Sequence, residues 1–394
     1  MERKVYLDNA STTYVSNEVL ADMLPVFSTI FGNSNSLHSF GRDAMALVDR
    51  SRDKIAKAIN AKSSEIYFTS GGTEANNWAL LGIARATKSK GNHIITSKIE
   101  HQSVLDACAI LEKEGFKVTY LPVDSTGLVS LADIMHAITK NTILISIMTV
   151  NNEVGTVQNI KAIAKTAKES GIIFHTDAVQ ALGAIKIDVK DMDIDALSLS
   201  AHKIYGPKGV GILYLKNGIK IDPLIVGGNA EKSKRGGTTN VPGIVGFGKA
   251  CEIAMRDMYA NQQKLKTIRE YFLTQLNKHL QFFNLNGHTQ QRIPSIVNLS
   301  FEMVEGEAIL LMLDLEGIAV STGSACTSGS LLPSHVLTAM GYNLEQAKGS
   351  IRFSFSKSIS KEDVDYVIEK TVKVIEVLRS MSPITKAGRG KKNV

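Results

Sequence analysis

Two side chains of opposite charge follow strand-like apolar runs in this chain. Asp177 comes directly after the run at 172–175, and Lys203 follows the run at 196–199. Open parallel sheets bind ligands at the carboxyl ends of neighbouring strands. A lysine there can form a Schiff base, and a carboxylate can keep a pyridine nitrogen protonated so that the ring accepts electrons. Together the two residues suit pyridoxal phosphate, although each alone is more often an ordinary polar side chain.

Three glycine-rich segments are candidates for binding a phosphate group. Residues 70–76, Ser-Gly-Gly-Thr-Glu-Ala-Asn, follow a predicted strand and open a helical run at 77–86, where N–H groups and the helix dipole attract anions. A helix cap with a turn explains them equally well. Residues 234–239 offer a guanidinium and two hydroxyls but alone indicate a surface loop. Residues 243–250 nearly match a nucleotide P-loop, yet Ala250 lacks the hydroxyl that binds Mg²⁺, so close helix packing is the better interpretation.

Further polar residues follow other predicted strands. His101 comes after the run at 94–97 and could stack on a planar cofactor and shuttle protons near neutral pH. The alternative is a polar loop histidine. Asn151, Asn152 and Glu153 follow the run at 142–148, with turn formation as their alternative role.

The three cysteines have different surroundings. Cys326 lies in Ser-Thr-Gly-Ser-Ala-Cys-Thr-Ser-Gly-Ser at 321–330, which has almost nothing apolar to bury it. We therefore expect a flexible loop with an accessible thiol, a candidate nucleophile. Cys108 and Cys251 sit among apolar residues at helical spacing and are expected to be small core residues. No pair has the spacing of a disulfide framework or a zinc site.

The elements that position these residues alternate between strand and helix. Strand-like runs occur at 66–69, 94–97, 118–121, 142–148, 172–175, 196–199 and 210–215, with helical patterns such as 103–114 and 160–169 between them. This alternation predicts a largely parallel sheet covered on both faces. A long helical stretch from about 248 to 280 leads to a second unit, with strands near 296–301, 319–322 and 351–355 and a closing helix at 361–379.

Composition bounds the class of protein. The 394 residues are enough for two domains, and 44% hydrophobic and 21% charged residues are ordinary for a globular chain. The net charge of +7 includes Lys386, Arg389, Lys391 and Lys392 in a basic tail, which we expect to be disordered. No basic stretch interleaved with aromatics points to nucleic acid, and no apolar run predicts a membrane helix or signal peptide. We therefore expect a cytoplasmic protein.

Several longer motifs resemble one family. They are Tyr-Phe-Thr-Ser-Gly-Gly-Thr-Glu-Ala-Asn-Asn at 67–77, Asn-Asn-Glu-Val-Gly at 151–155, His-Thr-Asp-Ala-Val-Gln at 175–180, Ser-Ala-His-Lys at 200–203 and the segment around Cys326. From Tyr6 to about Pro383 the chain resembles cysteine desulfurases of the NifS/IscS type, which are class-V aminotransferases and fold-type I pyridoxal-phosphate enzymes.

The resemblance implies roles for residues around the cofactor ring. Lys203 matches the Schiff-base lysine and Asp177 the partner of the pyridine nitrogen. Gln180 matches a donor to the ring hydroxyl. His101 matches the stacking histidine and the acid–base candidate, which we expect to take the thiol proton.

The resemblance also implies phosphate and substrate contacts. Thr73, Ser200 and His202 match phosphate ligands, with a backbone contact from Gly72, and Thr238 matches a ligand lent across the interface of a homodimer.

Three further residues match the substrate side of the family site. Asn152 matches a cofactor and substrate contact, and Arg352 the clamp for the substrate carboxylate, for which a planar guanidinium is well shaped. Cys326 matches the nucleophile that forms the persulfide.

The implied fold is α/β, a fold-type I transferase with a large, mostly parallel sheet domain and a smaller α+β domain. We expect an N-terminal arm at 1–14, a large cofactor-binding domain at 15–255, a small domain at 256–380 that carries the Cys326 loop, and the tail at 381–394. The implied reaction converts L-cysteine to L-alanine and passes sulfur from Cys326 to iron–sulfur cluster assembly, tRNA thiolation or both. No intrinsic metal is expected, although Cys326 could transiently ligate an iron–sulfur cluster with a scaffold protein.

Two rival functions remain. One is a fold-type I aminotransferase of small substrates, which would not need Cys326. The other is a sulfur-delivery scaffold that retains the fold but is catalytically idle, although the presence of Lys203, Asp177, Arg352 and Cys326 argues against this interpretation.

Overall fold

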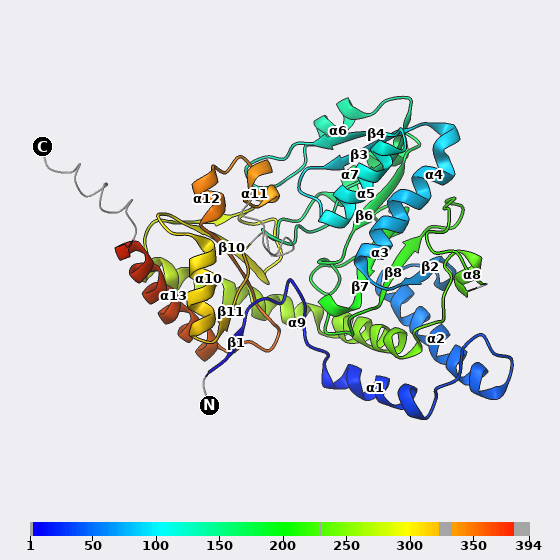
Figure 1. Cartoon of the computed structure of the whole chain (residues 1–394), viewed down its shortest axis with the longest axis horizontal. Helices are drawn as coiled ribbons and strands as arrows, with labels where there is room; N and C mark the ends of the chain where they lie inside the picture. The colour runs from blue at the N-terminus through cyan, green and yellow to red at the C-terminus, as the bar shows by residue number, and fades with distance from the viewer. Residues whose placement is uncertain (1–2, 229, 323–332, 382–394) are drawn as a thin grey trace, which may run out of the picture.

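The larger sheet is built from the strands that the sequence predicts. The structure is a computed structural model that describes residues 3–228, 230–322 and 333–381. Within these residues the sheet has seven strands, parallel except for β8, which runs antiparallel to both neighbours (Figure 1). In spatial order they are β2 (Ile66–Thr69), β8 (Gly211–Leu215), β7 (Ala196–Ser200), β6 (Ile173–Asp177), β5 (Thr142–Ser146), β3 (His93–Ser97) and β4 (Lys117–Leu121).

Successive residues of the central strands enter two different cores. Ile95 and Ile145 pack into one apolar cluster, while their neighbours Ile94 and Leu144 pack into another. A strand buried on both faces has no polar alternation, which is why these strands read as continuous apolar runs. The first cluster is shared with α1 (Asn17–Ser28), α2 (Ser39–Ala58), α6 (Leu131–Ala137), α7 (Ile160–Glu169) and α9 (Val241–His279), and the second with α3 (Gly72–Asn77), α4 (Ile83–Thr87) and α5 (Gln102–Lys113).

The two other cysteines are core residues, as predicted. Cys108 of α5 and Cys251 of α9 are each fully buried and belong to different clusters. The helical run expected at 77–86 begins earlier, at Gly72, and continues through a π-helical turn at 78–82. The earlier start is stabilised by Glu74, whose Oε2 accepts a hydrogen bond from the Ser70 N–H at 2.7 Å.

A second, smaller core lies around three antiparallel strands in the described part of the chain. Their order is β12 (Ser350–Ser354), β10 (Ile296–Phe301) and β9 (Phe283–Asn286), covered by α10 (Gly306–Leu315) and α13 (Lys361–Met381). The strand expected at 319–322 is the shorter β11 (Ile318–Ala319), which pairs in parallel with β1 (Val5–Tyr6). Two short helices, α11 (His335–Ala339) and α12 (Leu344–Lys348), pack against the turn after β5.

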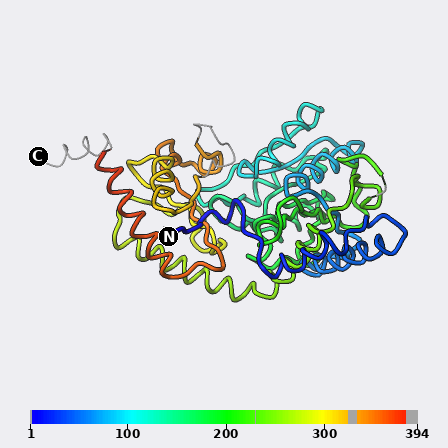
Figure 2. Tube along the Cα trace, turned by 60° about the horizontal axis from the view of Figure 1, so that its bottom comes forward, coloured from blue at the N-terminus to red at the C-terminus, as the bar shows by residue number. Residues whose placement is uncertain are grey.

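Helix α9 connects the two cores. Its first half contacts α1 and α2, and Ile268, Phe272 and Leu276 near its end belong to the second core. Figure 2 shows it running along both halves of the molecule. It begins at Val241 rather than at 248, because Pro242 fits a first helical turn and the Asn240 side chain caps the Gly243 N–H.

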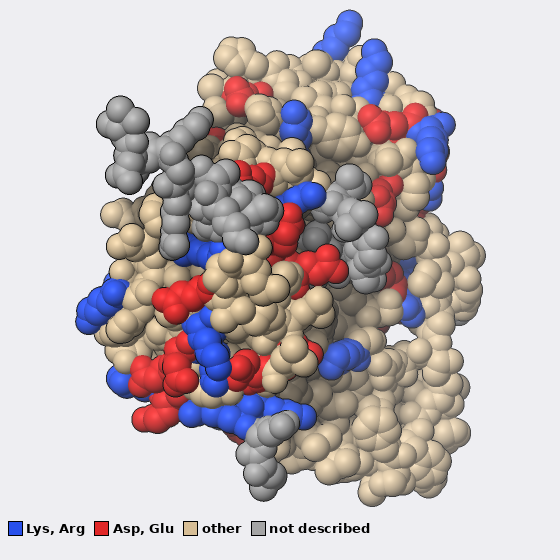
Figure 3. All heavy atoms as spheres, turned by 60° about the vertical axis from the view of Figure 1, so that its left-hand side comes forward, with Lys and Arg blue, Asp and Glu red and all other residues tan. Residues whose placement is uncertain are grey.

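The face formed by the smaller unit carries charges of both signs. Figure 3 shows lysine, arginine, aspartate and glutamate side chains interspersed there. Pairs such as Lys370–Glu316 at 2.8 Å and Lys361–Asp365 at 2.9 Å account for part of this mixture. Among the described residues, no helix is both long and apolar enough to span a membrane.

Candidate active site

A cavity of about 370 Å³ lies where β5, β6 and β7 end. At this point the sheet brings together residues that the sequence analysis placed at the ends of separate strands. Its wall includes Gly72, Thr73, His101, Asn152, Asp177, Gln180, Ser200, His202, Lys203 and Arg352.

Asp177 is held rigidly at the end of β6. Its Oδ1 accepts the Val179 N–H at 2.9 Å, and its Oδ2 accepts a bond from Asn76 Nδ2 at 2.6 Å. The side chain is almost fully buried. These contacts fix one carboxylate in the cavity wall.

A chain of hydrogen bonds leads from Asp177 to His101. Asn76 Nδ2 also donates to Ser103 Oγ at 2.9 Å, and Ser103 Oγ lies 2.8 Å from His101 Nδ1. The Ser103 N–H donates to the same Nδ1 at 3.2 Å, so His101 is the N-cap of α5. Burial lowers the pKa of His101, partly offset by the Asp177 charge. We therefore assign a neutral ring with its proton on Nε2.

Lys203 lies in the turn after β7 and contacts the N-terminal segment. Its Nζ donates to the carbonyl oxygens of Ala10 and Ser11, each at 2.6 Å. Gln180 Nε2 donates to the same Ala10 oxygen at 2.8 Å. Ala10 and Ser11, in the segment expected only as an arm, are therefore part of the cavity wall.

His202, the residue before Lys203, is also tied to this segment. Its Nδ1 lies 3.1 Å from Thr12 Oγ1, and its carbonyl oxygen accepts bonds from Thr13. Burial, together with the charges of Lys203 and Lys208, lowers the pKa of His202 to about 4. The imidazole is therefore neutral at physiological pH.

A second hollow, of about 330 Å³, adjoins the main cavity. Gly72, Thr73, Ser200 and His202 line both spaces. The hollow adds Thr12, Ser70, Gly71, Glu74, Lys208 and Gly209. Hydroxyls, glycine backbone and a lysine thus gather on one side of the site, while Asp177, His101 and Lys203 line the main cavity and not this hollow.

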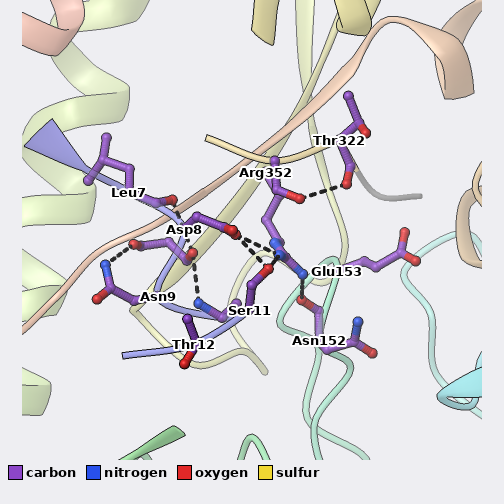
Figure 4. Close-up of polar contacts among 12 residues, drawn as sticks. Leu7, Asp8, Asn9, Ser11, Thr12, Asn152, Glu153, Thr322 and Arg352 are labelled. Atoms are coloured by element: carbon purple, nitrogen blue, oxygen red, sulfur yellow. Dashed lines mark hydrogen bonds and ion pairs between the residues drawn. The ribbon is translucent and has the colours of Figure 1, made fainter. Parts of the chain in front are cut away.

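Arg352 projects into the site from β12 of the smaller unit. Its side chain is only 4% exposed. Nη1 donates to the Asn152 carbonyl at 2.9 Å, and Nη2 donates to Asp8 Oδ1 at 2.9 Å and to Ser11 Oγ at 2.7 Å (Figure 4). The site is therefore built from both units and from the N-terminal segment.

The turn after β5 supports Asn152. Asn151 Oδ1 accepts the N–H groups of Glu153 and Val154, so Asn151 forms the turn expected as the alternative role of these residues. Asn152 contributes its carbonyl to Arg352 and lines the cavity. Glu153 is buried and accepts a hydrogen bond from Ser334 Oγ.

Two predicted site residues are not among those that line the main cavity in the described part of the chain. Thr238 is exposed and lines a separate hollow, which shares Ser70 and Gly209 with the hydroxyl-rich one. Cys326 lies outside the described residues. The described chain on either side of its segment reaches the site: Ser321 and Arg352 exchange backbone hydrogen bonds, and Ser334 contacts Glu153.

Sequence reasoning missed four polar residues that complete the site. Asn76 and Ser103 lie within or beside segments already singled out, and their polarity next to Thr73 and His101 was the available signal. Asp8 and Ser11 carried no local signal, because their partner Arg352 is more than 340 residues away. Among the described residues, no cluster of three or more His, Cys, Asp or Glu side chains is placed to hold a metal ion.

Known proteins resemble this chain along nearly its whole length. Residues 5–367 match the aminotransferase class-V family. A protein of Clostridium botulinum named cysteine desulfurase IscS is 53% identical over 386 residues, 98% of this chain and 97% of the relative. A solved NifS-like protein superposes with a TM-score of 0.90 at 37% identity, over 95% of this chain and all of the other. A structure described as SspA in complex with cysteine gives 0.80 at 39% identity, over 89% and 98% of the two chains. The architecture and these matches together show that the chain belongs to the aminotransferase class-V family.

Proposed function

We propose that this protein is a pyridoxal-phosphate-dependent cysteine desulfurase that converts L-cysteine to L-alanine and holds the sulfur as a persulfide on Cys326. The observation that carries the proposal is one cavity that joins Lys203, Asp177 and Arg352. Relatives named cysteine desulfurase and a similar structure with bound cysteine support the choice of substrate.

The residues present fit pyridoxal phosphate. An amine, a carboxylate and an imidazole line the main cavity, and the adjoining hollow offers hydroxyls, backbone N–H groups and Lys208 to a phosphate. Gly72, which lines both spaces, packs closely on Val179, since a Cβ there would lie only 2.8 Å from Val179 Cγ2. Asn76 Oδ1 is buried without a partner among the described residues, which leaves an acceptor for a bound group.

Each residue would hold a different part of the cofactor. Lys203 would carry it covalently, and Asp177 would pair with its pyridinium. Thr73, Ser200 and His202 would hold the phosphate, with the Gly72 N–H. When bound, the cofactor supplies an electron sink for the substrate's α-carbon.

The chain's own residues then bind substrate and move protons. Arg352 binds the substrate carboxylate, and Lys203, once displaced by the substrate amine, takes and returns protons at the α-carbon. His101 carries its proton on Nε2, because Nδ1 accepts from Ser103. In this tautomer Nε2 cannot accept a proton, so His101 would take the thiol proton at Nε2 only from the other tautomer, with its ring proton on Nδ1, which refines its expected role as a base.

Sulfur transfer needs the Cys326 thiolate. Its sulfur attacks the substrate sulfur, an S–S bond forms and the substrate C–S bond breaks. The electron pair stays on the carbon that becomes the methyl group of alanine, and that carbon takes a proton.

We further propose two domains, an arm and a homodimer. The first core draws on residues 10–253 together with Ile293 and Ile296, and the second on residues 268–375 together with Val5 and Leu7 of the arm at 1–14. This division supports a large domain at 15–255 and a small one at 256–380, with a contact between them at Ile293 and Ile296. Thr238 lies outside this chain's own cavity, which fits a phosphate ligand lent to a second copy. Iron–sulfur assembly or tRNA thiolation in the cytoplasm would receive the persulfide. Of the tail at 381–394, Met381 is the end of α13 and the rest lies outside the described residues.

One assay separates this proposal from its rivals. The purified protein with pyridoxal phosphate, L-cysteine and a reductant should release sulfide and alanine in equal amounts. Cys326→Ser should lose at least about 99% of sulfide release while its cofactor spectrum still responds to L-cysteine, since proton transfer at the α-carbon does not use Cys326. Cys108→Ser is the matched control and should retain turnover.

Lys203→Ala should retain the fold but lose covalent attachment of the cofactor after borohydride reduction, measured by mass spectrometry. Alanine formation by Cys326→Ser at the parent rate would contradict the desulfurase, and conversion of L-cysteine to a keto acid without sulfide release would favour the aminotransferase. Absence of both products from the parent protein would favour the idle scaffold.

A further inference from the structure

Asp8 holds the arginine proposed to bind the substrate carboxylate. Its Oδ1 accepts from Arg352 Nη2 at 2.9 Å and from Ser11 Oγ at 2.8 Å. Ser11 Oγ in turn accepts from the same Nη2 at 2.7 Å. The three groups therefore form a closed triangle, which Figure 4 shows beside the Asn152 carbonyl.

Two of the three groups in the triangle belong to the cavity wall. Arg352 and Ser11 line the cavity, whereas Asp8 is not among the residues that form its described wall. A substrate carboxylate would therefore meet the arginine from the cavity, while Asp8 contacts it from another direction. Asp8 is thus placed to orient the guanidinium without contacting substrate.

The backbone around Asp8 is fixed on the strand that carries Arg352. Asp8 forms a parallel bridge with Ser354, and the Ser354 N–H donates to Leu7 O at 2.7 Å. Asn9 Nδ2 donates to Ser354 O at 2.7 Å, and the Ala10 N–H donates to Ser354 Oγ at 2.9 Å. Because these contacts hold the main chain, the Asp8 carboxylate is a fixed point for the long arginine side chain.

The remaining donors of Arg352 are left for a ligand. A guanidinium has five N–H groups, and three contacts are made to Asp8, Ser11 and Asn152. Nε is buried and has no partner among the described residues. Asp8 also balances a nearly buried positive charge that would otherwise be costly to keep in place.

We propose that Asp8, acting with Ser11, is a positioning residue that presents Arg352 to the substrate carboxylate and thereby sets selectivity for free amino acids. The inference rests on the proposed function, because it takes Arg352 as the carboxylate clamp. It assigns Asp8 a role through Arg352 rather than contact with the reacting atoms.

The test compares ligands with and without a carboxylate. Binding of L-alanine and L-alaninamide to the pyridoxal-phosphate-loaded protein is measured by calorimetry. Asp8→Ala should weaken L-alanine about tenfold or more and change L-alaninamide by less than about twofold, because only L-alanine uses Arg352. Asp8→Asn keeps an oxygen acceptor and should restore L-alanine affinity to within about threefold of the parent.

Two further variants separate positioning from general loosening. Asp363→Ala removes the 2.9 Å ion pair with Arg3, which ties the same N-terminal segment far from the cavity, and should leave both affinities unchanged. In an Arg352→Gln background, Asp8→Ala should have no further effect on L-alanine, since the two residues act as one unit. Melting temperatures of the cofactor-free proteins identify a variant that fails to fold, in which case Ser11→Ala takes its place.

The kinetic readout should be a higher KM for L-cysteine with kcat little changed. The inference is overturned if Asp8→Ala weakens both ligands equally, leaves L-alanine unchanged, or still acts in the Arg352→Gln background. A parent protein that binds neither ligand overturns it as well. A parent that prefers L-alanine to its amide but yields no sulfide contradicts the proposed function and leaves this inference intact.

Discussion

Glu100 and His101 are adjacent residues whose charges are both suppressed. Glu100 is fully buried; its Oε1 accepts from Ser97 Oγ at 2.6 Å and from the Met148 N–H at 3.0 Å, and its Oε2 has no partner among the described residues. Burial raises the pKa of Glu100 to about 8, and burial lowers the pKa of His101. The two adjacent side chains are therefore largely neutral at pH 7, Glu100 inside the core and His101 in the cavity wall.

Glu100 should make the protein less stable as pH rises. Its folded-state pKa lies above the unfolded value, so its stabilising contribution is present below about pH 4 and is lost by about pH 8. The free energy of unfolding of Glu100→Gln, relative to that of the parent, should therefore increase by about 1–3 kcal/mol between pH 5 and pH 8. Urea unfolding of the cofactor-free proteins measures this difference.

The matched control for Glu100 is the exposed Glu307. Glu307→Gln should differ from the parent in free energy of unfolding by the same amount at pH 5 and at pH 8. An equal effect of Glu100→Gln at pH 5 and pH 8 would contradict the assignment.

A single site residue can be predicted from the sequence when a local pattern, such as a preceding apolar strand, singles out its position. Asp177, Lys203 and His101 follow apolar strands, and a parallel sheet brings such strand ends together. Asp8 gives no such mark, because it matters only through Arg352, 344 residues away. Pairing across that distance depends on the whole fold rather than on a local pattern.

Among the elements, Arg292 links the two sheets. It is buried, and its guanidinium donates to three carbonyl oxygens: Asn286 O at the end of β9, Ile296 O at the start of β10, and Val154 O in the turn after β5. Burial lowers the pKa of Arg292 to about 10. The charge is retained at neutral pH, where it satisfies carbonyls from both units.

Replacing Arg292 should loosen this junction. Arg292→Met keeps much of the volume but leaves carbonyl oxygens without donors, which should lower the unfolding free energy by about 2–4 kcal/mol. The exposed Arg50, whose bond to Ala46 O lies within α2, is the control, and Arg50→Met should cost under about 0.5 kcal/mol. Urea unfolding at pH 7 measures both, and equal losses would contradict a junction role.

Strands could be predicted from the sequence where both of their faces are buried, and helices where apolar residues recur at helical spacing. β2, β10 and α7 begin and end where the pattern indicates. β9 was missed because three of its four residues are partly or fully exposed, so Phe283–Asn286 has no apolar run. Helix α3 begins earlier than expected because glycines favour a turn, and only the Glu74 contact with Ser70 shows that the helix has already started.

At the scale of the whole molecule, one apolar face is left uncovered by the described residues. Leu20, Leu24 and Phe27 lie at helical spacing on α1 and are 42–62% exposed, and Phe31 and Leu37 follow at 65% and 91%. An apolar stripe of this kind is typical of an interface. It fits the proposed homodimer, which the sequence suggested only through resemblance and not through any pattern.

Dimer formation and cofactor retention should depend on each other. Phe27→Asp should give monomers in sedimentation and weaken pyridoxal phosphate binding, because Thr238 of the second copy is lost. Thr238→Ala should remain dimeric yet retain cofactor about tenfold less well, through loss of a hydrogen bond to a charged group. Leu311→Asp, at an exposed position on α10, is the control for a charge on an apolar surface. A Phe27→Asp monomer with full cofactor affinity would contradict the shared site.

The pairing of β1 with β11, and of Asp8 with Arg352, also sets the order of events on the ribosome. The first strand to be synthesised finds its neighbour only when residues 318–319 have emerged. At about 5–20 residues per second, the interval between Asp8 and Arg352 is roughly 20–70 s. During that time the large sheet and its lysine can form, but the carboxylate clamp does not yet exist. A nascent chain is thus able to acquire its cofactor pocket well before it can select an amino acid, and that selection begins only as synthesis nears its end.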